Sequence, residues 1–471
     1  LWAFNLSSQS PRDANDKTFG EFYAEWLGRN LERYRDGLTT SADVSGVMFD
    51  ADLYFDLKSS EADANNDMEL DNGVSPSGEN WLGKGLEDFY ASVRAQLPGK
   101  YVLAGHPLAR GYEWTHGNQL ESWLDYGNPD FSPSPVYRKV NEMFARYLFN
   151  TSDRATGPAL VQALTKTPTK QYPGNAGSAA TTNAPFRFAL AMALMEDGYF
   201  GTHSRLAGHA WWDEYAVYSD PADSNFGAAV PGTDAAAIRA NRGWLGQPVG
   251  KFERVYNESQ FRSGRSMISN GTFDKNINGW SATNVSISRD SGSSNDGPAS
   301  LRVSGMITYQ PDFGGASVKS KRFSVKSGQS YTVAVSLRSS DNREVLVSLG
   351  DDSARLPLSS QWRRYVFTLR PTTNSRTALK FSVGMEGDPV WIDSVYVFSG
   401  DANVFKREFD RGLAIANATP QPKTVTVGSG YRRITGTQDP EVNSGETVTE
   451  VTIPPYDGLL LIKTDAAGGG G

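Results

Sequence analysis

The sequence predicts two structural classes in one chain, a parallel α/β barrel followed by all-β domains. Up to about residue 250, short apolar runs alternate with amphipathic helical stretches, which is the order of a parallel sheet with crossover helices. The loops after these runs are long and rich in Gly, Asn, Asp, Tyr and Trp. They favour a barrel whose active face is built from the loops at strand ends. After Ser266, helical periodicity gives way to short alternating runs rich in Ser, Thr, Val and Gly, which indicates a β-sandwich.

The α/β region contains four expected helices and six expected strands. The helices are Lys17–Tyr34, Trp81–Gln96, Pro135–Phe149 and Pro185–Glu196. The strands are Trp2–Leu6, Gly46–Phe49, Tyr101–Ala104, Gln119–Trp123, Leu160–Leu164 and Tyr199–Thr202. In the all-β part the expected strands include Ser300–Val303, Ser330–Leu337, Glu344–Leu349, Tyr365–Leu369, Leu379–Val383, Val390–Phe398, Gly412–Asn417, Lys423–Val427 and Gly458–Ile462.

The length of 471 residues corresponds to two to four domains. We expect a barrel domain over 1–265, a sandwich module over 266–400 and a small C-terminal β-sandwich over 401–465. The last residues, 466–471, form a Gly-rich tail typical of a linker.

Composition and charge exclude several classes of function. The net charge is −7 and no basic block exceeds three residues, so the electrostatic footprint of a nucleic-acid binder is missing. No apolar stretch approaches the ~20 residues of a membrane span. The chain has no cysteine, which excludes disulfides and Cys-ligated zinc. With four histidines, a His-rich metal site is not expected.

Three motifs between residues 268 and 398 resemble the jelly-roll carbohydrate-binding modules of bacterial polysaccharidases. Ile268–Asp274, followed by Asn278-Gly-Trp280, is similar to their opening strand. Gln361–Phe367 is similar to their mid-domain Trp strand, and Val390–Tyr396 to their final strand. The resemblance implies a polysaccharide or oligosaccharide partner.

The same resemblance implies a structural Ca²⁺ in this module. In that family an Asp of the last strand and an acidic residue after the opening Phe often bind the ion, and the matching positions are Asp393 and Asp274. Carboxylate oxygens suit a hard cation. The alternative is that both are ordinary surface carboxylates. No cofactor is expected for catalysis.

Residues 1–265 and about 404–464 resemble a group of glycoside-hydrolase-like proteins with a (β/α)₈ barrel and a small C-terminal sandwich. The resemblance rests on the order of five motifs: Gly46–Asp50, Arg187–Phe200, Trp211–Tyr215, Lys406–Asn417 and Pro454–Leu461. It implies that the carbohydrate-binding module is inserted between barrel and terminal sandwich. It also implies a secreted or cell-surface protein that acts on or binds a polysaccharide.

By this resemblance Trp2–Leu6 is the third barrel strand. Two strands would then be missing, and we expect an N-terminal segment outside this chain, or another chain, to supply them. An open barrel would otherwise expose strand edges.

Glycoside hydrolysis usually needs one protonated and one ionised carboxyl group. Asp50 follows the expected fourth strand and Glu121 lies on the expected sixth, the strands that carry these groups in many retaining glycosidases. We therefore expect Asp50 as nucleophile and Glu121 as acid/base, with Glu214 as a reserve acid. Alternatively, Asp50 caps the following turn, and Glu121 points outward.

Aromatic and polar side chains near these carboxylates are candidates for substrate binding. Trp faces can stack on sugar rings while carboxylates hold hydroxyls, and the alternative is that the Trp pair packs as core. The candidates are Asp52, Tyr112, Trp114, His116, His209, Trp211, Trp212 and Asp213.

Two other functions stay open from the sequence. The first is a noncatalytic carbohydrate-binding or structural surface protein with a degenerate barrel. The second is a polysaccharide lyase, which would need a Lys, Tyr or His base near an acidic sugar.

Overall fold

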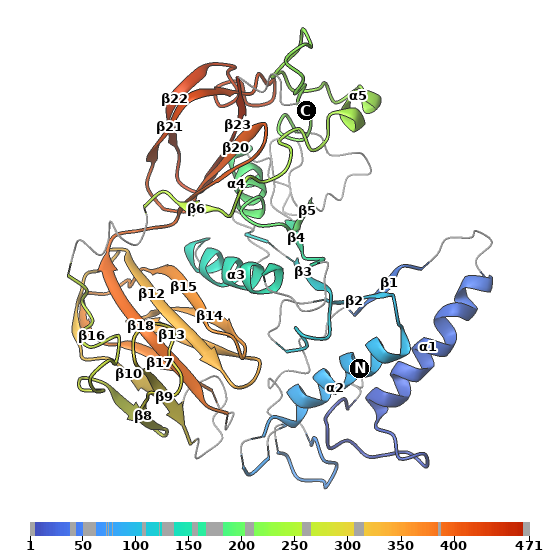
Figure 1. Cartoon of the computed structure of the whole chain (residues 1–471), viewed down its shortest axis with the longest axis vertical. Helices are drawn as coiled ribbons and strands as arrows, with labels where there is room; N and C mark the ends of the chain where they lie inside the picture. Colours follow the sequence, from blue (N-terminus) through green and yellow to red (C-terminus); the bar gives the residue numbers. More distant parts are fainter. Residues whose placement is uncertain are drawn as a thin grey trace. The chain divides into compact units, whose positions relative to one another are not determined.

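Figure 1 shows the helices and strands of the computed structural model. The chain comprises two compact units. The first unit comprises Leu1–Leu120, Ala145–Gln162 and Gly264–Gly400, and the second comprises Glu121–Phe144, Ala163–Ser263 and Asp401–Gly471. The residues that the structure describes are 5–37, 44–49, 63–71, 73, 75–77, 79–105, 110–121, 123–124, 136–152, 159–165, 182–202, 212–256, 265–305, 315–384 and 388–464.

The α/β region contains five helices and five strands of the expected sheet within these ranges. The helices are α1 (Phe19–Gly37), α2 (Trp81–Gln96), α3 (Val136–Thr151), α4 (Ala184–Ala193) and α5 (Ala235–Ala240). The strands are β1 (Gly46–Phe49), β2 (Tyr101–Ala104), β3 (Gly117–Glu121), β4 (Gln162–Thr165) and β5 (Tyr199–Thr202). The expected strand Trp2–Leu6 falls partly outside the described residues, and Asn5 and Leu6 are not in a strand.

These strands form an open sheet, so the prediction of a (β/α) barrel over 1–265 is wrong. The strand order is β1-β2-β3-β4-β5, with β1 and β5 as the two end strands among the residues described. β1 pairs with β2, and β2 with β3, in parallel. Alternation of strand and helix specifies parallel neighbours, whereas closure depends on strand tilt and stagger. Those quantities leave no trace in periodicity.

An open sheet does not require two further strands to complete it. The expectation that another segment or another chain supplies missing barrel strands therefore has no support.

The N-terminal part of the sheet packs on α2 through an apolar cluster. Leu86, Phe89 and Val93 are buried along one side of the helix and lie in one cluster with Val102 of β2. Asn80 caps the helix, because its side-chain oxygen accepts the N–H of Gly83 at 2.7 Å.

Within residues 265–400, the described strands form a two-sheet β-sandwich, as the sequence predicts for this part of the chain. One sheet has the order β14-β13-β17-β10-β7 and the other β15-β12-β18-β9-β8, beside a two-stranded pair β11-β16. The strands are β7 (Ser281–Thr283), β8 (Ser286–Asp290), β9 (Ser300–Ser304), β10 (Ser317–Lys319), β11 (Phe323–Val325), β12 (Tyr331–Ser339), β13 (Arg343–Leu349), β14 (Asp352–Leu358), β15 (Arg363–Leu369), β16 (Ser375–Thr377), β17 (Leu379–Ser382) and β18 (Val390–Ser399).

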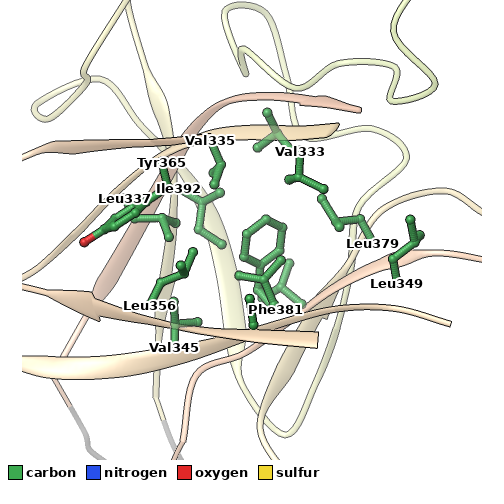
Figure 2. Packing of buried hydrophobic residues seen from close by; sticks show 14 of the residues in the cluster. Val333, Val335, Leu337, Val345, Leu349, Leu356, Tyr365, Leu379, Phe381 and Ile392 are labelled. Carbon is green, nitrogen blue, oxygen red and sulfur yellow. The ribbon is translucent and has the colours of Figure 1, made fainter. Parts of the chain in front are cut away.

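The core of the sandwich lies between the inner faces of the two sheets. Figure 2 shows Val333, Val335 and Leu337 of β12 facing Val345 of β13 and Phe381 of β17. All five side chains are fully buried. Because side chains alternate along a strand, the residues between them point to the outer faces.

The C-terminal strands form one six-stranded sheet in place of the expected small β-sandwich. Its order is β22-β21-β23-β20-β19-β6, and α4 contacts β20 and β23. Gly458 of β23 allows this approach, since a Cβ there would lie 2.3 Å from the carbonyl oxygen of Arg187. The bounds are β6 (Glu253–Arg254), β19 (Val404–Glu408), β20 (Gly412–Asn417), β21 (Lys423–Arg433), β22 (Thr447–Ile453) and β23 (Asp457–Lys463).

Over the described residues, the structure holds no helix with the length and apolar character needed to cross a membrane.

Candidate functional site

The outer face of the sheet β14-β13-β17-β10-β7 carries a continuous row of polar side chains. The strand register places Ser353 opposite Ser348, Ser348 opposite Lys380, Lys380 opposite Lys319, and Lys319 opposite Ser281. Their sequence neighbours Phe381 and Val318 are buried in the core. The row therefore points outward and crosses all five strands of the sheet.

A pocket of about 230 Å³ opens on this face. Its lining includes Ser348, the two lysines of the row, and two arginines from neighbouring segments, Arg322 and Arg376. Arg322 directly precedes β11, and Arg376 lies in β16, opposite Ser324 of β11. The turn between β10 and β11 and the short strand β16 thus complete the pocket. We call this surface, the polar row with its pocket, the basic face.

The outer face of the other sheet is built differently. Trp391 of β18 is 9% exposed, with the guanidinium groups of Arg338 and Arg302 over its ring at 4.9 and 5.9 Å from the ring centroid. Its indole N–H donates to Asp290 at 2.8 Å. The indole is thus occupied by protein groups, and little of it is open to solvent.

Asp393 and Asp274, the expected Ca²⁺ ligands, both lie against the loop 293–297. A register shift between β12 and β18 brings Asp393 opposite Ser336, and bulges of this kind re-aim side chains. The Oδ2 atom of Asp393 accepts the backbone N–H groups of Asn295 and Asp296 at 2.9 and 3.0 Å. A Cβ at Gly297 would lie 2.4 Å from Oδ1 of Asp274, and this glycine has a φ of +72°.

Burial raises the pKa of Asp393, and the nearby charge of Asp296 raises it further. The hydrogen bonds that its carboxylate accepts from backbone N–H groups act in the opposite direction. A cation beside this carboxylate would offset the cost of burying it. The oxygen donors present are of the kind that Ca²⁺ takes. Over the described part of the chain, however, no three His, Cys, Asp or Glu side chains form a group suited to a metal ion.

The expected catalytic residues are only partly placed. Asp50, Asp52, His209 and Trp211 lie outside the described residues. Glu121 is the last residue of β3 and is exposed. The roles expected for Asp50 as nucleophile and for Glu121 as acid/base stay predictions.

Trp212, Asp213 and Glu214 lie inside the second unit. The Trp212 ring stacks on Phe186 of α4 with ring centroids 4.0 Å apart. Oδ2 of Asp213 accepts the backbone N–H of Gln438 at 2.9 Å. Glu214 is 4% exposed, and its Oε1 accepts the side-chain amide of Asn443 at 3.0 Å. These three residues thus tie the 212–216 segment to α4 and to the loop 436–443.

Arg187 of α4 is the cation at the centre of this buried region. Its guanidinium makes two bonds with Asp457, at 3.0 and 2.8 Å, and also contacts Asp439. Burial raises the pKa of Glu214, while Arg187 acts in the opposite direction. A buried carboxyl whose pKa is raised by burial and lowered by a shared cation is typical of a structural charge cluster.

The three expected substrate-binding residues of the 112–116 segment have unequal exposure. Tyr112 is buried, and its hydroxyl donates to the carbonyl of Ser152 at 2.5 Å. His116 is buried, and its ring contacts Arg94 and accepts the N–H of Val102 at 3.0 Å. Trp114 is 41% exposed and is the one of the three that can offer a ring to a ligand.

Glu87 has a shifted pKa, and no pattern in the sequence marks it as a candidate. It lines a pocket of about 460 Å³ with Glu79, Lys84, Asp341 and Asp388. Burial raises its pKa to about 7, although Arg110 acts in the opposite direction. The signal in the sequence is weak, since Glu87 is one acidic residue in an amphipathic helix. Only the packing of α2 and Arg110 around it changes its chemistry.

No protein-family model and no curated protein matches the chain. Among solved structures, it is similar to a CBM4 domain at 18% identity and a TM-score of 0.23, over 27% of this chain and 100% of that one. It is similar to the N-terminal cellulose-binding domain of β-1,4-glucanase C from Cellulomonas fimi at 19% identity and a TM-score of 0.23, over 29% of this chain and 98% of that one. A third is a family 16 carbohydrate-binding module, at 14% identity and a TM-score of 0.23, over 28% and 98% of the two chains.

Replacing Arg187 with Met should lower the free energy of unfolding of the second unit by roughly 3–5 kcal/mol, because the carboxylates of Asp439 and Asp457 would be buried without their cation. Glu214→Gln should cost much less, since the amide oxygen can still accept the hydrogen bond that Oε1 of Glu214 accepts. Urea denaturation of both variants measures this. The control is Arg239→Met at an exposed position of α5. A Glu214→Gln variant as unstable as Arg187→Met would contradict the central place of Arg187 in this cluster.

The buried carboxyl of Glu87 predicts a pH-dependent stability. Its pKa in the folded chain, about 7, lies above the ordinary 4.5, so the folded chain holds a proton that the unfolded chain releases. Its contribution is complete below pH 4.5 and is lost as the pH rises through 7. The free energy of unfolding should thus fall over this range, and less steeply in Glu87→Gln. Denaturant titrations at a series of pH values test this, with Glu79→Gln as control. Parallel profiles for wild type and Glu87→Gln would rule out the raised pKa.

Proposed function

We propose that this protein binds a polysaccharide on the basic face of its β-sandwich. The observation that carries the proposal is the polar row that crosses all five strands of an outer sheet face. Adjacent strands lie about 4.8 Å apart, so the row spans about 19 Å. A surface of this length suits an extended chain of sugars better than a single small molecule.

The side chains of the row fit the chemistry of sugars. Ser hydroxyls both donate and accept hydrogen bonds, and Lys ammonium groups donate three. Sugar hydroxyls need partners of both kinds. The motifs in 268–398 that resemble carbohydrate-binding modules support the same proposal. A secreted or cell-surface location belongs to this proposal.

The basic face is favoured over the opposite sheet because it has room for a ligand. Its pocket is open and lined by polar side chains. On the other sheet, by contrast, Arg338 and Arg302 already lie over the ring of Trp391.

Hydrolysis by a carboxylate pair stays a prediction within this proposal. Glu121 is exposed at the end of β3, where an acid/base group could reach a glycosidic bond. New reducing ends released from a polysaccharide by the wild type, and lost in Glu121→Gln, would support it. Binding without any release of reducing ends would favour the noncatalytic alternative.

Ser348→Tyr should weaken polysaccharide binding at least about tenfold, because a large ring at the middle of the row excludes a chain lying across it. Tyr is favoured in strands, so the variant should fold. Affinity gel electrophoresis of the full chain against a panel of neutral and acidic polysaccharides measures the effect.

The matched control is Ser288→Tyr, the same change on the exposed strand β8 of the other sheet. It should bind as the wild type does. Equal loss in both variants, or no loss in Ser348→Tyr, would place binding elsewhere.

We also propose a structural Ca²⁺ held by Asp274 and Asp393 beside the loop 293–297. The buried carboxylate of Asp393 and the close approach of Asp274 to Gly297 support it. When bound, the ion would neutralise these two charges and fix the loop.

Millimolar Ca²⁺ should therefore raise the melting temperature of the chain by a few degrees relative to the protein in excess chelator, because a ligand that binds only the folded state stabilises it. Asp274→Asn should abolish the shift while leaving the melting temperature in chelator nearly unchanged. Differential scanning calorimetry measures both. A wild type with the same melting temperature in Ca²⁺ and in chelator would contradict the proposed Ca²⁺ site.

A further inference from the structure

We propose that the polysaccharide bound by the basic face is acidic, with carboxylate or sulfate groups that pair with Lys319, Arg322, Arg376 and Lys380. This inference rests on the proposed function and narrows its ligand class. In this proposal the acid groups of the polysaccharide bind in the pocket of about 230 Å³. The serines of the row contact the sugar hydroxyls.

The strand register places two like charges side by side. Lys319 of β10 lies directly opposite Lys380 of β17 in an antiparallel pair. Side chains opposed in this way have Cβ atoms about 5 Å apart, and like charges there destabilise a sheet. An anion placed between the two ammonium groups would turn this repulsion into attraction.

Protection of a sheet edge does not explain the two lysines. Lysine is common on edge strands, where its charge blocks edge-to-edge association. Both β17 and β10 are interior strands of the order β14-β13-β17-β10-β7. Because neither strand is an edge strand, these lysines do not protect a sheet edge. Their charges are instead available on the outer face of the sheet.

The four cations of the pocket lack anionic partners among the residues that the structure describes. Neither an ion pair nor a side-chain hydrogen bond involves Lys319, Arg322, Arg376 or Lys380 there. Elsewhere in the first unit, two arginines are paired with carboxylates, Arg110 with Asp341 at 2.6 Å and Arg146 with Glu344 at 2.8 Å. The described pocket lining contains no Asp or Glu.

The positive charge of the pocket contrasts with the negative net charge of the whole chain. The net charge is −7, so the average surface repels a polyanion, and a local basic pocket selects where one can bind. The described lining also contains no aromatic side chain. Stacking is a main source of affinity for single-stranded nucleic acids, so the pocket suits a sugar polyanion better than a nucleic acid.

The test compares acidic polysaccharides with neutral ones of the same backbone. Polygalacturonate is set against its methyl ester, and dextran sulfate against dextran, so that carboxylate and sulfate groups are distinguished. Binding to the full chain is measured by isothermal titration calorimetry. We expect an acidic polymer to bind at least about tenfold more tightly than its neutral partner, and added salt to reduce this difference because it screens exposed charges.

The decisive variant is Lys319→Gln/Lys380→Gln. It should weaken binding of the acidic polymer at least about tenfold, without lowering the melting temperature, since it removes a repulsive pair. Its control is Lys275→Gln/Lys326→Gln, which removes two exposed lysines outside the pocket lining. The control should bind as the wild type does.

Three results would overturn the inference. A neutral polymer bound as tightly as its acidic partner, and blocked by Ser348→Tyr but not by the double lysine variant, would leave the proposed function standing and remove the acidic ligand. Double-stranded DNA bound through the same lysines with equal affinity would make the face a general polyanion site. Acidic and neutral polymers whose binding neither Ser348→Tyr nor the lysine variant affects would remove the proposed function as well.

Discussion

The apolar layer between the two sheets of the sandwich is the constraint on which the candidate site depends. Phe381 and Val318 are fully buried in that layer. A one-residue slip of either strand would move its whole apolar set to the solvent side, so burial specifies the register strongly. Since alternate residues face opposite sides, burying Phe381 and Val318 turns Lys380 and Lys319 outward. The basic face is thus a consequence of core packing.

Buried charge organises the second unit in a different way. Arg187 joins α4 to Asp457 at the start of β23 and to Asp439 in the loop before β22. The carboxyls around it are costly to bury, and burial raises the pKa of both Glu214 and Asp457. Trp212, Asp213 and Glu214, which the sequence offers as candidates for substrate binding or catalysis, take part in this packing. A cluster of Trp, Asp and Glu in a sequence can mark a structural joint as readily as a ligand site.

Two groups of residues become functional candidates only through their surroundings in the folded chain. Neither group is marked by a pattern in the sequence. Lys319 and Lys380 are 61 positions apart in the chain, and only the pairing of β10 with β17 brings them together. Burial raises the pKa of Glu87, although Arg110 acts in the opposite direction. Neither effect has a local signal, because each arises between residues distant in sequence.

The sequence alone determined the local elements and the change from α/β to all-β structure. The helix Trp81–Gln96 and the strands Gly46–Phe49, Tyr101–Ala104 and Tyr199–Thr202 have the expected bounds, because apolar periodicity is a property of neighbouring residues. Only the tertiary structure decided that the parallel sheet stays open, that the C-terminal strands form one sheet, and which side chains meet on the basic face. Closure and strand pairing depend on the geometry of segments far apart in the chain, which periodicity does not contain.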